Sequence, residues 1–181
     1  MSTTATLPRI EGKRVIVVVA PANFRDPEYF VPKQILEDAG AQVLTASTQM
    51  GPIVGIEGRS TNVDMLVKDV VATSFDACLY VGGSGASVYF DDQAAQMIPT
   101  VMNNQGKLIS AICIAPTTFA RAGLLRGKKA TAFPSAQADL VSNGALYTGR
   151  AVEQDGNIIT ANGPEASKAF GETIVRALAA K

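Results

Sequence analysis

The sequence predicts an α/β fold with a mainly parallel central sheet. Short continuous apolar runs, typical of strands buried on both faces, alternate with segments whose apolar residues recur at helical spacing. Such alternation is the mark of strands and helices arranged around a parallel sheet. With 181 residues, of which 47% are hydrophobic, the chain is long enough to bury a sizeable core.

The elements are expected in alternating order along the chain. A strand over 14–20 leads to a helix that Asp26-Pro27-Glu28 opens, with Asp26 as its N-cap, and that Gly40 closes. Residues 51–64 carry glycines and alternating apolar residues, which favours a short antiparallel excursion. Further strands are predicted over 41–46, 75–81 and 107–112, further helices over 91–104, 115–122, 136–143 and 165–180, and a hairpin around Asp155-Gly156 joining 151–154 to 157–161.

Nothing in the composition divides the chain. It contains no internal repeat and no low-complexity segment, so residues 1–181 are expected to form a single domain. Residues 1–12 are expected to be a flexible N-terminal extension.

Charge and composition exclude several partners. Lys plus Arg and Asp plus Glu number sixteen each, so no net field attracts nucleic acid or an anionic membrane. The start of the chain lacks a signal-peptide pattern, and the aliphatic run 15–20 is too short to span a bilayer, so a cytoplasmic protein is expected. Two cysteines without any histidine rule out the usual zinc spacings, and we expect no metal and no cofactor.

Cys113 is the most informative residue of the chain. It lies where an apolar strand is expected to run into a helix opened by Pro116, with small residues at Ala111 and Ala115. This is the pattern of a nucleophile elbow, and a thiol beside a helix N-terminus should ionise more easily than a free one. The alternative is a small buried hydrophobe at a strand end, and the local pattern alone does not decide between the two.

Glu28 also has two interpretations. A carboxylate in the first turn of a helix complements the helix dipole and needs no other role. If it is instead desolvated near the Cys113 thiol, it keeps its proton and can donate a hydrogen bond to a thiolate or a substrate oxygen.

A glycine turn follows the strand that ends near Val81. Gly82-Gly83-Ser84-Gly85 is not followed by a Gly-Lys-Ser/Thr motif and lacks the dinucleotide spacing, so a nucleotide site is not expected. Its exposed amides, in particular that of Gly83, could form an oxyanion hole with the amide of Ile114. A tight turn that simply requires positive φ is the other interpretation, and the two are compatible.

The remaining cysteine and several aromatic residues are assigned to packing. Cys78 lies inside an apolar strand, where a thiol behaves as a small hydrophobe. Tyr80, Phe90, Phe119 and Phe133 are also interpreted as packing residues rather than as cofactor contacts.

Several motifs, taken in order, resemble one known family. They are FRDPEYFVP (24–32), ACLYVGG (77–83), AIC (111–113) with Pro116, AGLLRGKKAT (122–131), RAV (150–152) and DGNIITANGP (155–164). Each motif is weak alone, but the ordered set, from about Arg14 to Leu178, resembles the ThiJ/PfpI superfamily, whose fold is of the class I glutamine amidotransferase type.

This resemblance implies a flavodoxin-like three-layer sandwich that assembles as a homodimer or a larger homo-oligomer. It also implies a reactive elbow cysteine with a nearby glutamate, which fall on Cys113 and Glu28, while the glycine pair of the family falls on Gly82 and Gly83. Members are described as peptidases, as glyoxalases or deglycases, as isonitrile hydratases or as oxidation-responsive stress proteins. Fold and nucleophile do not choose among these activities.

Departures from the family pattern narrow the choice. Ile114 stands where the peptidase and chaperone branches have a histidine, and the chain contains none, so a Cys–His dyad is impossible and peptidase activity is not expected. The Parkinson-associated branch has a histidine near residues 131–134, which is absent here as well. Ala115 replaces the usual glycine and narrows the room beside the elbow.

Two functions remain open at this stage, and a scaffold with a vestigial site is a third possibility. In the first, Cys113 adds to a small electrophile such as a reactive carbonyl, Glu28 shuttles the proton, and the amides of Gly83 and Ile114 hold the oxyanion, as in a glyoxalase-like or deglycase-like lyase or hydrolase of stress protection. In the second, the protein is a non-catalytic sensor in which an oxidant converts Cys113 to a sulfinic acid. The apolar Ile114 mildly favours the second, because it offers no proton relay.

Overall fold

A seven-stranded sheet forms the centre of the protein. The computed structural model describes residues 5–181, and the strand order within them is β11-β12-β8-β7-β1-β3-β6. Neighbouring strands are parallel throughout, except for the antiparallel pair β11 and β12. The predicted mainly parallel α/β fold is confirmed. The strands are β1 (Arg14–Val18), β3 (Gln42–Ser47), β6 (Met65–Leu66), β7 (Ala77–Tyr80), β8 (Leu108–Ile112), β11 (Val152–Asp155) and β12 (Ile158–Ala161).

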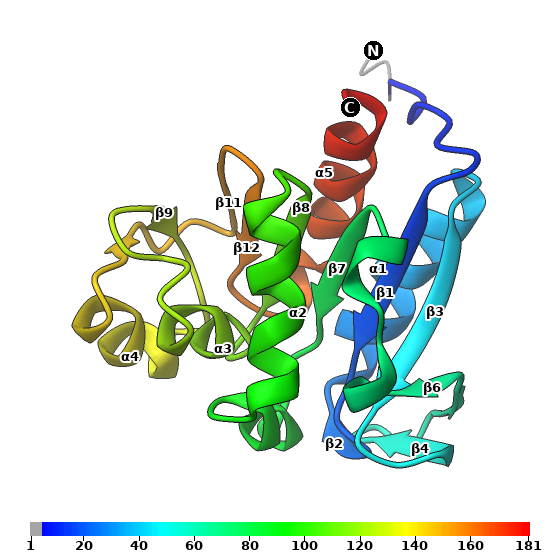
Figure 1. Cartoon of the computed structure of the whole chain (residues 1–181), viewed down its shortest axis with the longest axis horizontal. Coiled ribbons are helices and arrows are strands. Elements are labelled where there is room, and N and C mark those ends of the chain that lie inside the picture. The colour runs from blue at the N-terminus through cyan, green and yellow to red at the C-terminus, as the bar shows by residue number, and fades with distance from the viewer. Residues whose placement is uncertain (1–4) are drawn as a thin grey trace.

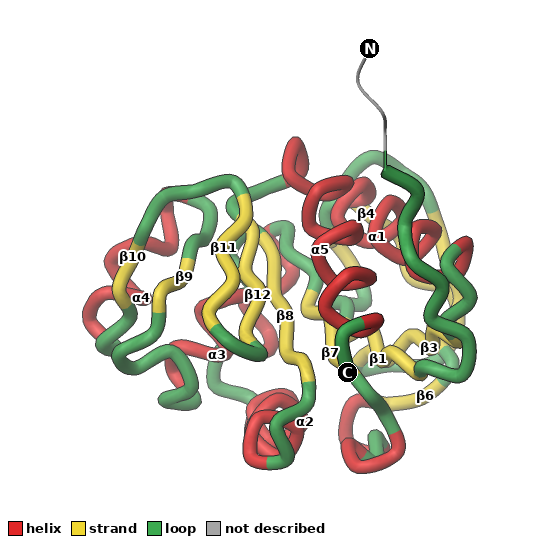
Figure 2. Tube along the Cα trace, turned by 90° about the horizontal axis from the view of Figure 1, so that it is seen from above, coloured by secondary structure: helices red, strands yellow, loops and turns green. Residues whose placement is uncertain are grey.

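Helices cover both faces of this sheet, which gives three layers. Helices α1 (Asp26–Asp38) and α5 (Ser167–Ala179) pack against each other on one face, and α2 (Gln93–Asn104) crosses the other face with α3 (Pro116–Arg121) beside it. The two sets lie on opposite sides of the strands when the molecule is seen from above (Figure 2), and α2 passes in front of the sheet in Figure 1. Helix α4 (Gln137–Ser142) packs on α3.

The alternation of side chains along β1 explains the two-sided core. Val15 and Val17 belong to the apolar cluster under α1 and α5, whereas Ile16 and Val18 belong to the cluster under α2 and α3. All four are fully buried. Successive side chains of a strand point to opposite faces, and burying one such side chain stabilises the fold by ~1.5–3 kcal/mol.

A second, three-stranded sheet contains the predicted antiparallel excursion. β4 (Gly51–Gly55) and β5 (Ser60–Val63) pair antiparallel, as expected. β2 (Ala22–Phe24) pairs in parallel with β4 and was not predicted, because three residues around Asn23, whose φ is 58°, are too few to show a strand period. For the same reason the two-residue strands β9 (Lys129–Ala130) and β10 (Leu146–Tyr147) gave no sequence signal.

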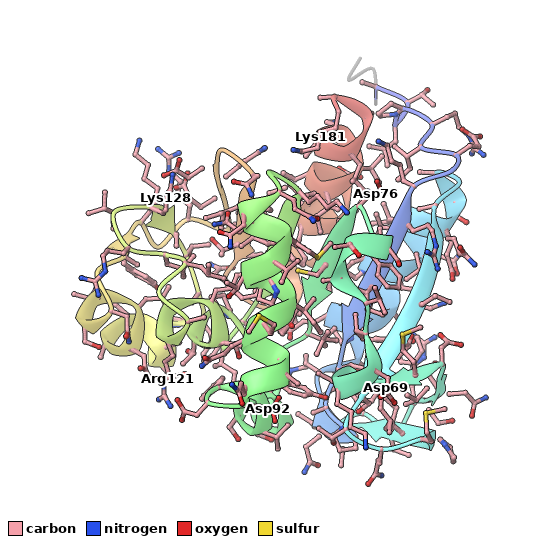
Figure 3. All side chains as sticks on the ribbon, viewed as in Figure 1. Asp69, Asp76, Asp92, Arg121, Lys128 and Lys181 are labelled. Atoms are coloured by element: carbon pink, nitrogen blue, oxygen red, sulfur yellow. The ribbon has the colours of Figure 1, made fainter. Side chains whose placement is uncertain are left out.

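Most helix boundaries lie close to their predicted positions. Asp92, labelled in Figure 3, caps α2 by accepting a hydrogen bond from the Ala95 N–H at 2.8 Å. Helix α5 begins later than expected, because residues Pro164–Ala166 form a 3₁₀ turn in front of it.

The expected flexible extension over residues 1–12 lies in part outside the described residues, which begin at position 5. Within the described part, Ile10 is buried and its N–H donates to the Ala39 carbonyl at 2.8 Å. Leu7 packs on the same apolar cluster. These contacts attach this portion of the segment to the end of α1.

Two further observations concern a membrane and a metal ion. No helix within residues 5–181 is long and apolar enough to cross a membrane. The same residues contain no group of three or more His, Cys, Asp or Glu side chains arranged to hold a metal ion.

Candidate active site

Cys113 lies at a sharp turn between β8 and α3. Strand β8 ends at Ile112 and α3 begins at Pro116, so the predicted strand–elbow–helix arrangement is confirmed. The φ angle of Cys113 is 65°. Among residues 5–181, only Asn23 and several glycines also have a positive φ. This conformation is strained for a residue with a side chain, so the surrounding structure must hold it in place.

Two backbone hydrogen bonds hold the elbow. The Cys113 N–H donates to the carbonyl of Ala161, the last residue of β12, at 2.9 Å. The Phe133 N–H donates to the Cys113 carbonyl at 2.8 Å. Both polar groups of the strained residue are therefore paired, and the Cys113 side chain is left 7% exposed.

Glu28 enters the site from the first turn of α1. The chain leads into this helix through Arg25, whose N–H donates to the Gly82 carbonyl at 3.1 Å, just beyond β7. This bond brings the start of α1 to the carboxyl end of the sheet, where Glu28 is completely buried. Parallel strands direct their carboxyl ends to one edge, which is why β7, β8 and α1 meet there.

Gly82 lies between Glu28 and Cys113. A Cβ at this glycine would lie 2.5 Å from Glu28 Oε2 and closer still to the Cys113 Cβ. The Ile112 carbonyl oxygen would be 2.9 Å away. Any side chain at position 82 would force Glu28 and Cys113 apart, so the close approach of these two residues requires glycine.

Burial raises the pKa of Glu28 to about 7. Three weaker effects act in the opposite direction: the Cys113 thiol as a hydrogen donor, the positive charge of Arg25 and the amide of Gly82. Neither carboxyl oxygen has a hydrogen-bond partner of good geometry within the described residues. At neutral pH this carboxyl is therefore close to its midpoint, and its proton is easily gained or lost.

The pKa of the Cys113 thiol is raised as well, to about 12. Burial is the main cause, and the charge of Glu28 is the next. The amides of Gly83 and Ile114 face the sulfur and lower the pKa, but they do not outweigh burial. The expectation of an easily ionised thiol is wrong for the resting site, because the desolvation of a nearly buried sulfur dominates.

The structure brings Gly83 and Ile114, the two predicted backbone donors, to the same sulfur. Gly83 has a φ of 94°, and a Cβ there would lie 2.5 Å from the Arg25 nitrogen. The glycine conformation thus both requires the absence of a side chain and points an amide into the site. Cys113, Glu28, Gly83 and Ile114 therefore form one cluster, drawn from α1 and from the ends of β7 and β8.

Asp26 is not the N-cap that the sequence indicated. Arg25 holds that position, and Asp26, which is fully buried, lies one residue inside the helix. Its Oδ2 accepts a hydrogen bond from the Glu57 N–H at 2.8 Å, and its Oδ1 accepts one from the Arg59 N–H at 3.0 Å. Asp26 thus ties the turn between β4 and β5 to the helix that carries Glu28.

The packing assignments hold for Cys78, Tyr80 and Phe119, whereas Phe90 is only half-buried, with the Arg121 guanidinium 5.2 Å from its ring centre. Cys78 is completely buried, and burial raises its pKa to about 12, so its assignment to the core is confirmed. Tyr80 and Phe119 are also buried and pack edge to face. Phe133 is 43% exposed and is not a core residue. Its position directly before Pro134, beyond a buried segment, is the signal that could have placed it on a loop.

Comparison with known proteins identifies the family. The model of the DJ-1/PfpI family matches residues 13–177. The chain belongs to the DJ-1/PfpI family. An uncharacterized protein of Methanocaldococcus jannaschii is 38% identical over 173 residues, which cover 93% of this chain and 84% of that protein. A deglycase of Pyrococcus abyssi is 30% identical over 149 residues, which cover 82% of this chain and 90% of that protein.

Solved structures of DJ-1/PfpI proteins have the same fold. A ThiJ/PfpI domain protein from Brachyspira murdochii superposes with a TM-score of 0.91 at 32% identity, covering 94% of this chain and 99% of that one. The flavodoxin-like fold expected from the sequence is therefore confirmed.

Proposed function

We propose that the protein is a Cys113-dependent enzyme that acts on small reactive carbonyl compounds, in the manner of a glyoxalase or deglycase, and so protects the cell against carbonyl stress. The observation that supports it most is the pairing of a thiol with a carboxyl whose pKa is about 7. A general base or acid works best when its pKa lies near the operating pH. The deglycase name of a relative points to the same chemistry.

The first chemical step is addition of sulfur to the carbonyl carbon. Ionised Glu28 takes the proton from the Cys113 thiol while Sγ bonds to the aldehyde carbon of a 2-oxoaldehyde and the carbonyl electron pair moves to oxygen. The amides of Gly83 and Ile114 both face the sulfur, and they stabilise the developing oxyanion. Glu28 then returns the proton to that oxygen, which gives a hemithioacetal.

The remaining steps need only the same carboxyl and one water molecule. Glu28 removes the proton from the carbon that carries sulfur and delivers it to the neighbouring carbonyl carbon. The hydroxyl proton of the hemithioacetal passes to the neighbouring carbonyl oxygen, so the sulfur-bearing carbon becomes the carbonyl and its neighbour the alcohol. The product is a thioester of a 2-hydroxy acid, so one carbon is oxidised and its neighbour is reduced without an external redox partner. Water then cleaves the thioester and restores the thiol. Methylglyoxal would leave as lactate.

Peptide hydrolysis fits this chain poorly. The sequence contains no histidine, so no imidazole can protonate a leaving amine. A carbonyl substrate of the type described above has no such leaving group during the first step.

The experiment that tests the proposed function is lactate production from methylglyoxal. Wild type should form lactate, Cys113→Ser should not, and Cys78→Ala should retain activity because Cys78 lies completely buried in the core. Equal lactate production by wild type and Cys113→Ser would refute the proposal.

A second candidate is an oxidation sensor without turnover. Two amides and a carboxyl that is readily protonated surround the Cys113 sulfur, and these donors suit the oxygens of a sulfinic acid. Hydrogen peroxide would supply both oxygens in two successive attacks by sulfur, and each attack would release water or hydroxide. A two-oxygen adduct confined to Cys113 at low peroxide, with no lactate formed by wild type, would favour this candidate.

Three expectations stay predictions: the homodimer or larger homo-oligomer, the cytoplasmic location and the single-domain organisation.

A further inference from the structure

A cavity of about 250 Å³ lies between two short loops near the elbow. Residues 133–134 form one wall and residues 162–165 form the other. Three apolar rings line it, those of Phe133, Pro134 and Pro164. Its volume and lining suit a small organic group rather than a polymer.

Both walls are directly connected to Cys113. Phe133 donates its N–H to the Cys113 carbonyl, and Ala161, which accepts the Cys113 N–H, immediately precedes the loop of the opposite wall. The two hydrogen bonds that hold the strained elbow therefore also fix the two walls. A group placed between the walls would lie next to the backbone segments that hold Cys113.

The Phe133 ring is supported on one side and free on the other. A Cβ at Gly163 would lie 3.4 Å from the Phe133 Cδ2, which places the ring over this glycine. The side chain nevertheless remains 43% exposed. An aromatic face that is held in place and left open can stack against a second ring.

Among residues 5–181, Glu165 is the only charged residue that lines the cavity, and it is exposed. A carboxylate at this position repels substrates that carry a negative charge. Phe133 and Glu165 therefore favour the same kind of occupant, one that is apolar and not anionic.

We propose that Phe133 determines specificity and selects uncharged carbonyl substrates that carry an aromatic or bulky apolar group next to the reacting carbonyl. This inference rests on the proposed function, because it names the substrate class of the same site. The aromatic group would occupy the cavity between Phe133 and Pro164 while Cys113 reacts with the carbonyl carbon.

The test compares phenylglyoxal, which would yield mandelate, with methylglyoxal, which would yield lactate. The measured quantity is the ratio of kcat/KM for phenylglyoxal to that for methylglyoxal. In Phe133→Ala this ratio should fall roughly 10-fold relative to wild type. In Phe133→Leu the ratio should fall less, because leucine retains apolar area. Val141→Ala removes another exposed apolar side chain, from α4 and outside the cavity, and should leave the ratio unchanged.

A second measurement separates this inference from the proposed function. Phenacyl bromide and bromoacetone alkylate a thiol directly: a carbon–sulfur bond forms, bromide leaves, and no turnover is needed. The rate ratio of the two reagents at Cys113, followed by intact mass, should fall in Phe133→Ala by a similar factor. If wild type turns over neither aldehyde, the proposed function fails. The ratio of the two alkylation rates then tests on its own whether Phe133 selects aromatic groups. An unchanged ratio in Phe133→Ala would overturn the inference.

Discussion

The Glu28 carboxyl and the Cys113 thiol meet across Gly82, and each shifts the pKa of the other. The thiol lowers the pKa of Glu28 as a hydrogen donor, while the charge of Glu28 raises the pKa of Cys113. Burial raises both, to about 7 and about 12. At neutral pH the proton that moves readily is that of Glu28, so we expect this residue, rather than a preformed thiolate, to control the reactivity of the site.

Removal of this carboxyl should abolish most turnover. Glu28→Gln keeps the shape of the side chain but cannot transfer a proton, so kcat/KM for methylglyoxal should fall at least about 100-fold. Glu37→Gln changes an exposed carboxylate on the same helix and should have no effect. Full activity in Glu28→Gln would remove Glu28 from the mechanism.

The same variant should lower the pKa of the Cys113 thiol. Glu28→Gln removes the negative charge that raises this pKa, so the midpoint of the pH profile of iodoacetamide alkylation at Cys113 should lie at lower pH than in wild type. Cys78→Ala, which leaves Cys113 and Glu28 in place, is the control and should have the midpoint of wild type. A midpoint at higher pH in Glu28→Gln would mean that the charge of Glu28 lowers the thiol pKa instead of raising it.

Stability should depend on pH through Glu28. Its folded-state pKa, about 7, lies above the ordinary value of 4.5, so the folded state binds the proton more tightly. The stabilisation of the folded state by this tighter proton binding is fully present below pH 4.5 and is lost as the pH rises to about 7. Above that pH, Glu28 no longer changes the free energy of unfolding with pH. Urea unfolding should show that wild type loses stability relative to Glu28→Gln across this window, by at most about 3 kcal/mol. Parallel pH profiles of the two proteins would contradict the burial of an ionisable Glu28.

Position 82 should tolerate nothing larger than glycine. In Gly82→Ala the new methyl group would press on Cys113, Glu28 and the Ile112 carbonyl, so we expect a loss of about 1–3 kcal/mol in the free energy of unfolding. Gly163→Ala meets only ordinary contact with the Phe133 ring and should cost less. Equal stability of wild type and Gly82→Ala in urea would show that Glu28 and Cys113 are not as close as described.

Asp26 should act through structure. Asp26→Ala leaves the Glu57 and Arg59 amides without their carboxylate acceptor, and unfolding should become easier by about 2 kcal/mol. Asp26→Asn retains one acceptor oxygen and should lose less. Asp69→Ala removes an exposed carboxylate and should change little. The account would be wrong if Asp69→Ala destabilised the protein more than Asp26→Ala.

The sheet and the elbow could be predicted from the sequence because their signals are local. The apolar run of β1 is buried on both faces, and small residues around Cys113, with Pro116 behind it, define a strand–turn–helix. The ordered family motifs then identified Glu28 as the partner of Cys113.

What the sequence did not predict depends on contacts between distant residues. Asp26 is typical of an N-cap in its local context, but its carboxylate oxygens accept hydrogen bonds from two backbone amides more than thirty residues away. The thiol pKa was predicted in the wrong direction, because the extent of burial around the sulfur outweighs the nearby amides and cannot be read from neighbours in sequence. Phe133 was assigned to packing, since its type is apolar, although it faces a cavity.

The most direct test of the central claim is to look for the substrate bound to sulfur during turnover. Wild type mixed with methylglyoxal, quenched in acid within the first turnovers and mapped by mass spectrometry, should carry a lactoyl thioester on Cys113, and Cys78 should remain free. Steady lactate formation with no adduct on Cys113 at any quench time, and at the same rate in Cys113→Ser, would contradict covalent catalysis by this residue.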